Sequence, residues 1–276
     1  MTRATVATGE RAHGVGAPGR ARIAAGTLRK DRWWIAPLLT FSLLSAWVIY
    51  AMVRTMSQRA YYVEKYDYLS PFSSPCLSAS CHPGARSLGT WFGHFPPFLP
   101  FALLILPFLL GFRLTCYYYR RAYYRSFWLS PPACAVPEPH GAYTGERRFP
   151  LILQNAHRYF FYAAVIVSVL NTYDAVRAYK GGDGGAGVGL GSIIITINVV
   201  LLWTYTISCH SCRHAIGGRL KHFSAHPLRY RAWTFISKLN TRHMELAWTT
   251  LATLVITDAY IALVASGAFA DPRIYN

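Results

Sequence analysis

Long stretches without a charged residue are the feature that most limits what this chain can fold into. Three runs contain no Asp, Glu, Lys or Arg: 21 residues between Arg32 and Arg54, 26 between Arg86 and Arg113, and 29 between Asp183 and Arg213. About 20 apolar residues cross a bilayer core as an α-helix. Because 53% of the residues are hydrophobic and only 14% are charged, the runs are predicted to be membrane spans rather than parts of a soluble core.

Two further apolar runs contain a few charged or histidine side chains. The run from Leu151 to Val176 holds His157, Arg158 and Asp174, and the run from Thr241 to Phe269 holds His243, Glu245 and Asp258. Charged groups inside a span are costly and often mark a site or a partner. The sequence therefore predicts an all-α integral membrane protein with five transmembrane helices at about 33–54, 92–115, 151–176, 188–210 and 241–269.

The distribution of lysine and arginine predicts the orientation. Segments 1–32, 113–158 and 210–242 hold seven each, whereas 54–92, 177–188 and the tail hold four, two and one. Basic loops stay on the cytoplasmic side, so we expect a basic cytoplasmic N-terminal arm at 1–32, followed by a membrane domain at 33–276. The net charge of +17 then reflects topology and attraction to anionic lipid. No motif indicates nucleic-acid binding.

The six cysteines divide by the side of the membrane on which they are expected. Cys76 and Cys81 lie on the outer side, where disulfides persist, so a structural disulfide is predicted between them. The other four are expected near the cytoplasmic ends of spans. There, cysteines are more often metal ligands or plain buried residues than disulfides. These four are Cys116, Cys134, Cys209 and Cys212.

An internal repeat singles out two of these cysteines. The segments LTCYYYRRA (114–122) and ISCHSCRHA (207–215) align Cys116 with Cys209, and each is followed by a basic loop and a span that opens with a histidine. His157 comes 41 residues after Cys116, and His243 comes 34 residues after Cys209. The sequence therefore predicts that four helices of a bundle bring two cysteines and two histidines together near the cytoplasmic face.

Two thiols and two imidazoles at one point allow several metal sites. A Cys₂His₂ zinc site is usually structural, and a mononuclear iron site is conceivable. A Rieske-type [2Fe–2S] cluster uses two thiolates on one iron and two imidazoles on the other, and it gives a membrane span an evident redox use. We favour the cluster. A local zinc site formed by Cys209, Cys212, His210 and His214 remains open, although neighbouring residues on a helix diverge in direction.

At these residues the chain resembles the membrane-anchor subunit of succinate dehydrogenase (respiratory complex II). More narrowly, it is similar to the mycobacterial single-anchor type, in which a Rieske-type cluster stands where other complexes hold haem. The resemblance covers roughly 113–248 and rests on the Cys and His segments 114–128, 154–164, 205–214 and 240–248. It implies docking on an iron–sulfur subunit that docks on a flavoprotein subunit, and electron transfer to membrane quinone in a bacterial plasma membrane.

The chain departs from the resemblance in its local motifs. Soluble Rieske proteins use Cys-x-His and Cys-x-x-His pairs, and here only Cys212 with His214 fits the first. A single haem b held by His157 and His243 is therefore the main alternative cofactor, but it leaves the cysteine repeat unexplained. A structural anchor or a transporter is the alternative function. A homo-oligomer of the whole complex is also compatible with the sequence.

Two weaker sets of residues complete the sequence predictions. The first set could contact a quinone, either menaquinone or ubiquinone, beyond the metal centre, although each member has an equally ordinary role at a helix end or in an interfacial aromatic belt. It consists of Asp174, Asp258, His94, Tyr173 and Trp91. The second set could contact a partner subunit or lipid headgroups, or could be ordinary cytoplasmic loop charge. It consists of Arg120, Arg121, Arg213 and Arg219.

Overall fold

The computed structural model describes residues 29–79, 81, 83–87, 89–91, 93–94, 96, 105–134, 136, 149–218 and 220–276. Helices dominate these ranges, and the few strands are two or three residues long. The prediction of an all-α membrane protein is thereby confirmed. Most of the basic arm at 1–32 and part of the expected span at 92–115 lie outside the described residues, as does Arg219.

Four of the described helices are long and apolar enough to cross a bilayer. They are α2 (Ile35–Ser57), α5 (Phe149–Arg177, apolar from Ile152), α6 (Leu190–Ile207) and α9 (His243–Ala265). These four correspond to the first, third, fourth and fifth predicted spans. Of the second predicted span, the described residues form one helix, the nine-residue α3 (Leu106–Leu114), which has Pro107 in its first turn. Pro fits there because the first-turn N–H groups have no partner within the helix.

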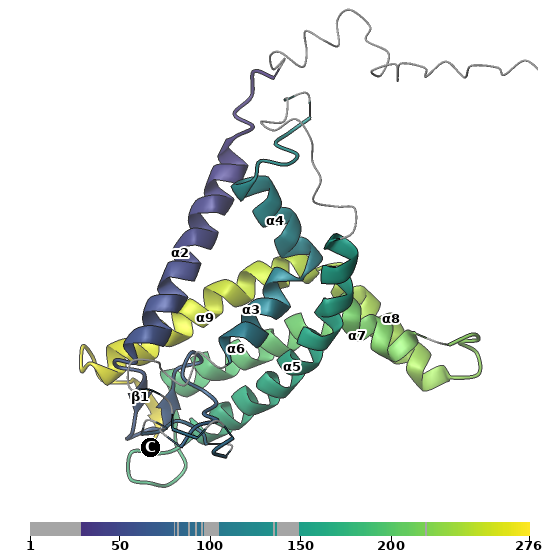
Figure 1. The fold of residues 1–276 in the computed structure, drawn as a ribbon. Helices are drawn as coiled ribbons and strands as arrows, with labels where there is room; N and C mark the ends of the chain where they lie inside the picture. Colours follow the sequence, from purple (N-terminus) through teal and green to yellow (C-terminus); the bar gives the residue numbers. More distant parts are fainter. Residues whose placement is uncertain are drawn as a thin grey trace, which may run out of the picture. The chain divides into compact units, whose positions relative to one another are not determined.

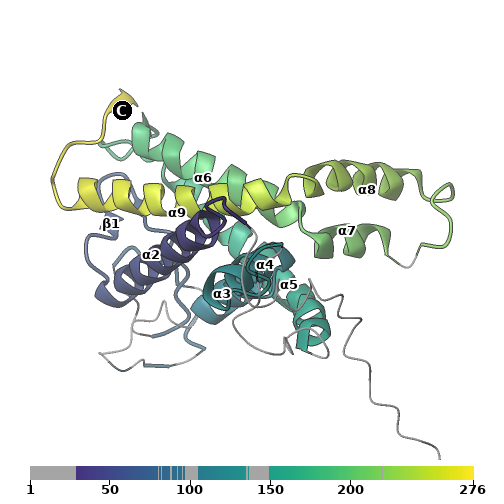
Figure 2. The same ribbon diagram turned by 90° about the horizontal axis from the view of Figure 1, so that it is seen from above.

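Shorter helices follow two of the apolar helices after a break. Helix α3 ends with Thr115 as its C-cap, and α4 (Tyr117–Phe127) begins two residues later. Helix α6 ends with Ser208 as its C-cap, and α7 (His210–Gly217) also begins two residues later. Helix α8 (Pro227–Asn240) packs beside α7, and the two form a hairpin that projects away from the C-terminus (Figure 2). The chain thus breaks at two cysteines, Cys116 and Cys209.

Contact clustering divides the chain into two compact units, 1–42 with 122–144 and 43–121 with 145–276. In the first unit the described residues include the start of α2 and most of α4, and the rings of Phe41 and Phe127 lie 4.7 Å apart. The second unit holds α3, α5, α6 and α9. Within it, α6 lies against both α5 and α9, and α3 lies against α5 (Figure 1).

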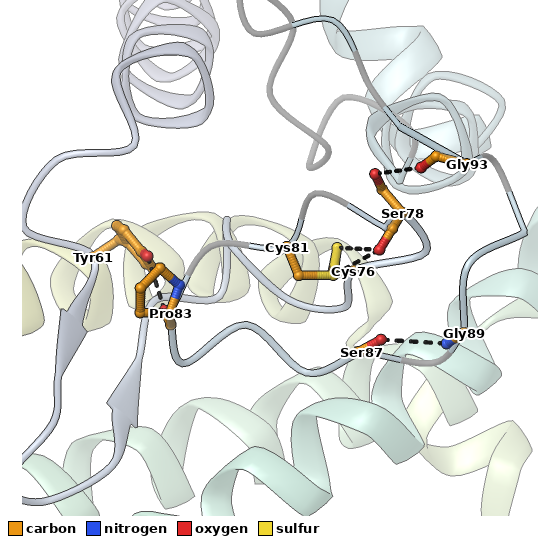
Figure 3. Close-up of a disulfide and its surroundings, with 8 residues drawn as sticks. All are labelled: Tyr61, Cys76, Ser78, Cys81, Pro83, Ser87, Gly89 and Gly93. Atoms are coloured by element: carbon orange, nitrogen blue, oxygen red, sulfur yellow. Dashed lines mark hydrogen bonds between the residues drawn. A yellow bond between two sulfur atoms is a disulfide. The ribbon is translucent and has the colours of Figure 1, made fainter.

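Two short antiparallel ladders organise one end of the second unit. Strand β1 (Tyr62–Val63) pairs with β2 (Tyr68–Leu69), and β3 (Val188–Gly189) pairs with β4 (Arg273–Tyr275). In the loop that follows β2, Cys76 and Cys81 form a disulfide (Figure 3). Tyr61 and Ser78 donate hydrogen bonds to the carbonyl oxygens of Pro83 and Gly93, respectively. The loop is therefore tied together by covalent and polar contacts.

Buried carboxylates at this same end pair with arginines. Asp67 accepts hydrogen bonds from Arg86 and Arg177 at 2.8 and 2.7 Å. Burial alone would raise the pKa of Asp67, but the hydrogen bonds from the two arginines hold that pKa below its ordinary value. These ion pairs connect the loop to α5. Removing one partner of such a buried ion pair destabilises a protein by more than the intact pair stabilises it.

The candidate metal centre

The four predicted ligands come together in the second unit. Cys116 lies between α3 and α4, Cys209 lies between α6 and α7, His157 belongs to α5, and His243 is the first residue of α9. All four line one cavity of about 450 Å³. The Sγ of Cys209 lies 3.0 Å from His157 Nε2, and the Sγ of Cys116 lies 3.6 Å from His243 Nε2.

These contacts form two Cys/His pairs, each joining the two halves of the repeat. In the described part of the chain, no three His, Cys, Asp or Glu side chains are grouped closely enough to hold a metal ion. The four side chains are nevertheless all buried, with 1–7% of their surface exposed. A buried set of two thiols and two imidazoles has the right donor types for zinc or for an iron–sulfur cluster.

Both thiols lie at the start of a helix. Cys209 is the N-cap of α7, and its sulfur accepts a hydrogen bond from the Ser211 N–H at 3.4 Å. Burial raises the pKa of the Cys116 thiol, and the backbone N–H groups of Tyr119 and Tyr118 act in the opposite direction. Helix N-termini stabilise thiolates because their N–H groups and dipole favour negative charge. At Cys116 the effect of burial is the larger one and the pKa lies above its ordinary value, so a bound metal must displace the thiol proton before the sulfur can act as a ligand.

Two hydroxyl groups determine which nitrogen of each histidine is free. Thr115 Oγ1 lies 2.8 Å from His157 Nδ1 and donates its proton to the Gly111 carbonyl at 2.7 Å. A hydroxyl has one proton, so Thr115 must accept from His157, whose Nδ1 then carries the hydrogen. The Nε2 of His157, which faces Cys209, is left with its lone pair.

The second histidine has the same arrangement. Ser208 Oγ lies 2.7 Å from His243 Nδ1 and donates to the Tyr205 carbonyl at 2.7 Å. The same proton count leaves the Nε2 of His243 with its lone pair toward Cys116. A hydrogen bond to the far ring nitrogen is the usual way in which proteins orient an imidazole ligand. Each hydroxyl comes directly before one of the two cysteines. The repeat therefore pairs a hydroxyl residue as well as a cysteine at each position.

Aromatic rings hold the imidazoles from one side. Phe112 stacks on His157 with centroids 5.0 Å apart and planes at 4°, and Tyr205 stacks on His243 at 4.9 Å and 13°. Phe112 and Tyr205 each stand four residues before their cysteine. Sequence reasoning missed this pair, together with the roles of Thr115 and Ser208. The sequence did contain a signal for this pair, because an aromatic residue stands four positions before each cysteine.

The local zinc alternative receives no geometric support. Cys209 and Cys212 are buried, whereas His210 and His214 are exposed. His214 instead has its Nδ1 3.4 Å from the Nη2 of Arg158. Cys209 and His210 line the cavity of the centre, whereas Cys212 and His214 do not, so the four side chains do not meet at one point.

The predicted quinone contacts lie away from the centre. Asp174 pairs with Arg86 at 2.9 Å, and Asp258 is fully buried against Arg54 at 2.5 Å. Both carboxylates thus serve the ion pairs at the end of the unit that carries the disulfide. The three remaining residues of this set, Tyr173, Trp91 and His94, are exposed.

The arginines predicted to contact a partner subunit differ in exposure and in their contacts. Arg120 is 5% exposed and lines the cavity of the centre, and Arg121 is exposed. The guanidinium of Arg213 lies over the Trp233 ring at 4.7 Å, which joins α7 to α8. A stacked arginine contributes packing as well as charge, so Arg213 has a structural contact within the hairpin.

Comparisons with known proteins identify the family of the chain. Residues 35–267 match the family model described as "Actinobacterial succinate dehydrogenase subunit SdhC". A chain of the solved structure "Mycobacterium smegmatis Sdh1 complex in the apo form" is 64% identical, with a TM-score of 0.83, over 91% of this chain and 94% of that chain. A search of curated proteins found no match. The chain belongs to the actinobacterial succinate dehydrogenase SdhC family and is a membrane-anchor subunit of such a complex.

Proposed function

We propose that this subunit relays electrons from the soluble subunits of succinate dehydrogenase to a membrane quinone through a Rieske-type [2Fe–2S] cluster. The proposed ligands are Cys116, His157, Cys209 and His243. The observation that carries the proposal is the pair of imidazoles whose Nδ1 atoms are held by Thr115 and Ser208, so that both free nitrogens face a thiol.

The donor set and its surroundings favour a cluster over the alternatives. A haem held by both histidines would use the two Nε2 atoms and leave two buried thiols at helix N-termini without a role. A single zinc ion would give the membrane bundle no redox use, whereas a cluster would carry the electrons that this proposal requires. When bound, a histidine-ligated cluster supplies one-electron transfer at a higher potential than an all-cysteine cluster.

The protein's own residues have three tasks in this proposal. The two cysteines would supply negative charge as thiolates once a metal has displaced their protons. The hydroxyls orient the imidazoles, and Phe112 and Tyr205 exclude water from one side. Oxidation of succinate to fumarate releases two electrons and two protons, and reduction of a quinone to a quinol takes up two of each. The chain would carry only the electrons, one at a time.

The partners follow from the family and from the charge distribution. We propose that the iron–sulfur subunit docks on the cytoplasmic side, where the cavity of the centre is lined by polar side chains such as Gln154, Asn240 and Arg120, and that the flavoprotein subunit docks on it in turn. The basic loops would hold this side against the cytoplasmic leaflet of a bacterial plasma membrane, where lysine and arginine are enriched and anionic lipids attract them.

Electron paramagnetic resonance of the whole complex tests the proposal. The reduced wild-type complex should show a signal with the low average g-value of histidine-ligated [2Fe–2S] centres. The His157→Ala/His243→Ala double variant should lose that signal and quinone reduction, while succinate still reduces a soluble dye at the flavoprotein. Loss of a sharp reduced-haem absorption band instead would assign the histidines to haem. An unchanged spectrum with unchanged quinone reduction would leave the chain a structural anchor.

A further inference from the structure

One arginine lies inside the helix bundle beside the candidate metal centre. Arg113 is in the last turn of α3, three residues before Cys116, and it borders an apolar cavity between α2, α3, α5 and α6. Within the described residues Arg113 forms no ion pair with a carboxylate. Arginine keeps its charge in proteins, and a charge inside a membrane bundle is costly, so it usually has a function there.

Aromatic rings and hydroxyl groups hold this guanidinium in place. It lies over the rings of Tyr205, Tyr119 and Trp47 at 5.2–5.7 Å. It also donates hydrogen bonds to the Tyr119 hydroxyl and, at 3.4 Å, to Thr250 Oγ1. These contacts come from α2, α4, α6 and α9. The positive charge therefore has a fixed position among the helices that surround the centre.

The ring of Tyr205 stands between this charge and one of the proposed ligands. The guanidinium lies 5.2 Å from the centroid of that ring, and the same ring stacks on His243 with centroids 4.9 Å apart. The guanidinium is therefore within about 10 Å of the His243 imidazole, where at an effective dielectric constant of about 20 a unit charge changes an equilibrium constant by more than tenfold. Salt screens partly buried charges much less than exposed ones.

We propose that the positive charge of Arg113 sets the reduction potential of the metal centre. One-electron reduction adds one negative charge to a centre held by the four proposed ligands. A fixed cation stabilises the reduced form more than the oxidised form, and it does so without any rearrangement at the moment of transfer. The centre then accepts electrons from the soluble subunits more readily. This inference deepens the proposed function and rests on it for the identity of the centre.

Three substitutions separate the charge from the packing of the side chain. Arg113→Gln removes the cation, whereas Arg113→Lys keeps it. Arg231→Gln is the matched control, because it removes the same charge from an exposed position on α8 in the same unit. For each purified complex, a redox titration followed by electron paramagnetic resonance gives the midpoint potential. The g-values and the iron content report whether the ligands remain in place, and dye reduction by succinate reports on the soluble subunits.

Arg113→Gln is expected to lower the midpoint potential by at least a tenfold change in the one-electron equilibrium constant, which is about 59 mV. Its g-values, iron content and dye reduction should match wild type. Arg113→Lys and Arg231→Gln should stay close to the wild-type potential. A shift in Arg113→Gln no larger than that in Arg231→Gln would overturn the proposal. Equal shifts in Arg113→Gln and Arg113→Lys would also overturn it, since the effect would then come from packing.

A second pair of variants tests the charge without replacing Arg113. Thr250→Asp places a carboxylate where the Thr250 hydroxyl now accepts a hydrogen bond from the guanidinium, so it should neutralise the cation and lower the potential as Arg113→Gln does. Thr250→Asn has nearly the same shape without the charge and should stay close to wild type. If Arg113→Gln does not assemble, this pair decides the question. Equal potentials in the two Thr250 variants would contradict the proposal.

The wild-type spectrum separates failure of this inference from failure of the proposed function. If the wild-type complex lacks the signal of a histidine-ligated cluster, the proposed relay fails and the inference fails with it. If the signal is present and is lost in His157→Ala/His243→Ala, but the charge variants leave its potential unchanged, the relay stands and only the role of Arg113 is wrong.

Discussion

At the scale of single residues, the hydroxyls of Thr115 and Ser208 decide the chemistry of the candidate site. Each hydroxyl gives its proton to a backbone carbonyl and therefore accepts from the Nδ1 of a histidine. The pair converts two buried imidazoles into oriented ligands with free Nε2 atoms. Without these hydroxyls, the rings would still pack against Phe112 and Tyr205 but could present either nitrogen to the thiols.

The Thr115→Val/Ser208→Ala variant tests this role. It should lower metal affinity about 10–100-fold, the usual effect of losing a group that orients a metal ligand, while the complex still assembles. Iron content per complex after dialysis against a chelator gives the measurement. Thr249→Val is the control, because Thr249 is exposed and its hydroxyl donates only to the Glu245 carbonyl. Equal iron retention in both variants would show that the hydroxyls do not orient the ligands.

At the scale of elements, the position of the site depends on how closely α3 approaches α5. Gly111 faces the Phe160 ring so tightly that a Cβ at residue 111 would lie 2.3 Å from a ring carbon. The same glycine carbonyl receives the Thr115 hydroxyl. A small residue at 111 therefore allows α3 to bring Cys116 near the helix that carries His157, and the helix break after α3 then turns the sulfur toward the centre.

Gly111→Ala is expected to destabilise the subunit despite the better helix propensity of alanine. The propensity gain is about 1 kcal/mol, whereas overpacking costs about 1–3 kcal/mol. Phe160→Leu in the same chain removes the clashing ring and should restore the thermal midpoint and iron content lost by Gly111→Ala. Failure of Phe160→Leu to rescue the variant would mean that the approach of α3 to α5 does not depend on this contact.

At the scale of the whole molecule, the metal ligands and the buried ion pairs occupy separate parts of the second unit. The ligands lie among the helix breaks and the start of α9. The ion pairs instead join α2 to α9, and α5 to the segment that contains Asp67, Arg86 and the disulfide. We expect the first part to face the cytoplasm and the second to face outward, since disulfides persist outside the reducing compartment and basic loops stay inside.

Cysteine labelling in intact cells tests this orientation. Asp183→Cys in the exposed loop before α6 should react with a membrane-impermeant maleimide in intact cells. Leu228→Cys in α8, where residue 228 is 78% exposed, should react only after the membrane is opened. The opposite labelling pattern would invert the topology, and labelling of both sites in intact cells would contradict a membrane between them.

Some features follow from the sequence because they depend on local physics. Uncharged runs of span length require helices in a bilayer, since no other open structure satisfies the backbone there. The described residues include four such helices, and Leu106–Leu114 belongs to the second predicted span. The paired Cys and His residues were visible as a repeat. The family itself was recognisable from these residues, and the comparisons confirm it.

Other features were decided only by the tertiary structure, because they depend on contacts between residues far apart in the chain. Spacing could bring Cys116 and His243 to similar depth, but only packing pairs each thiol with the histidine of the other half of the repeat. Packing also assigned Asp174 and Asp258 to arginines, which no local pattern indicates. It placed Arg113 against an apolar cavity beside the centre, because the direction of a side chain within a bundle depends on which helices surround it.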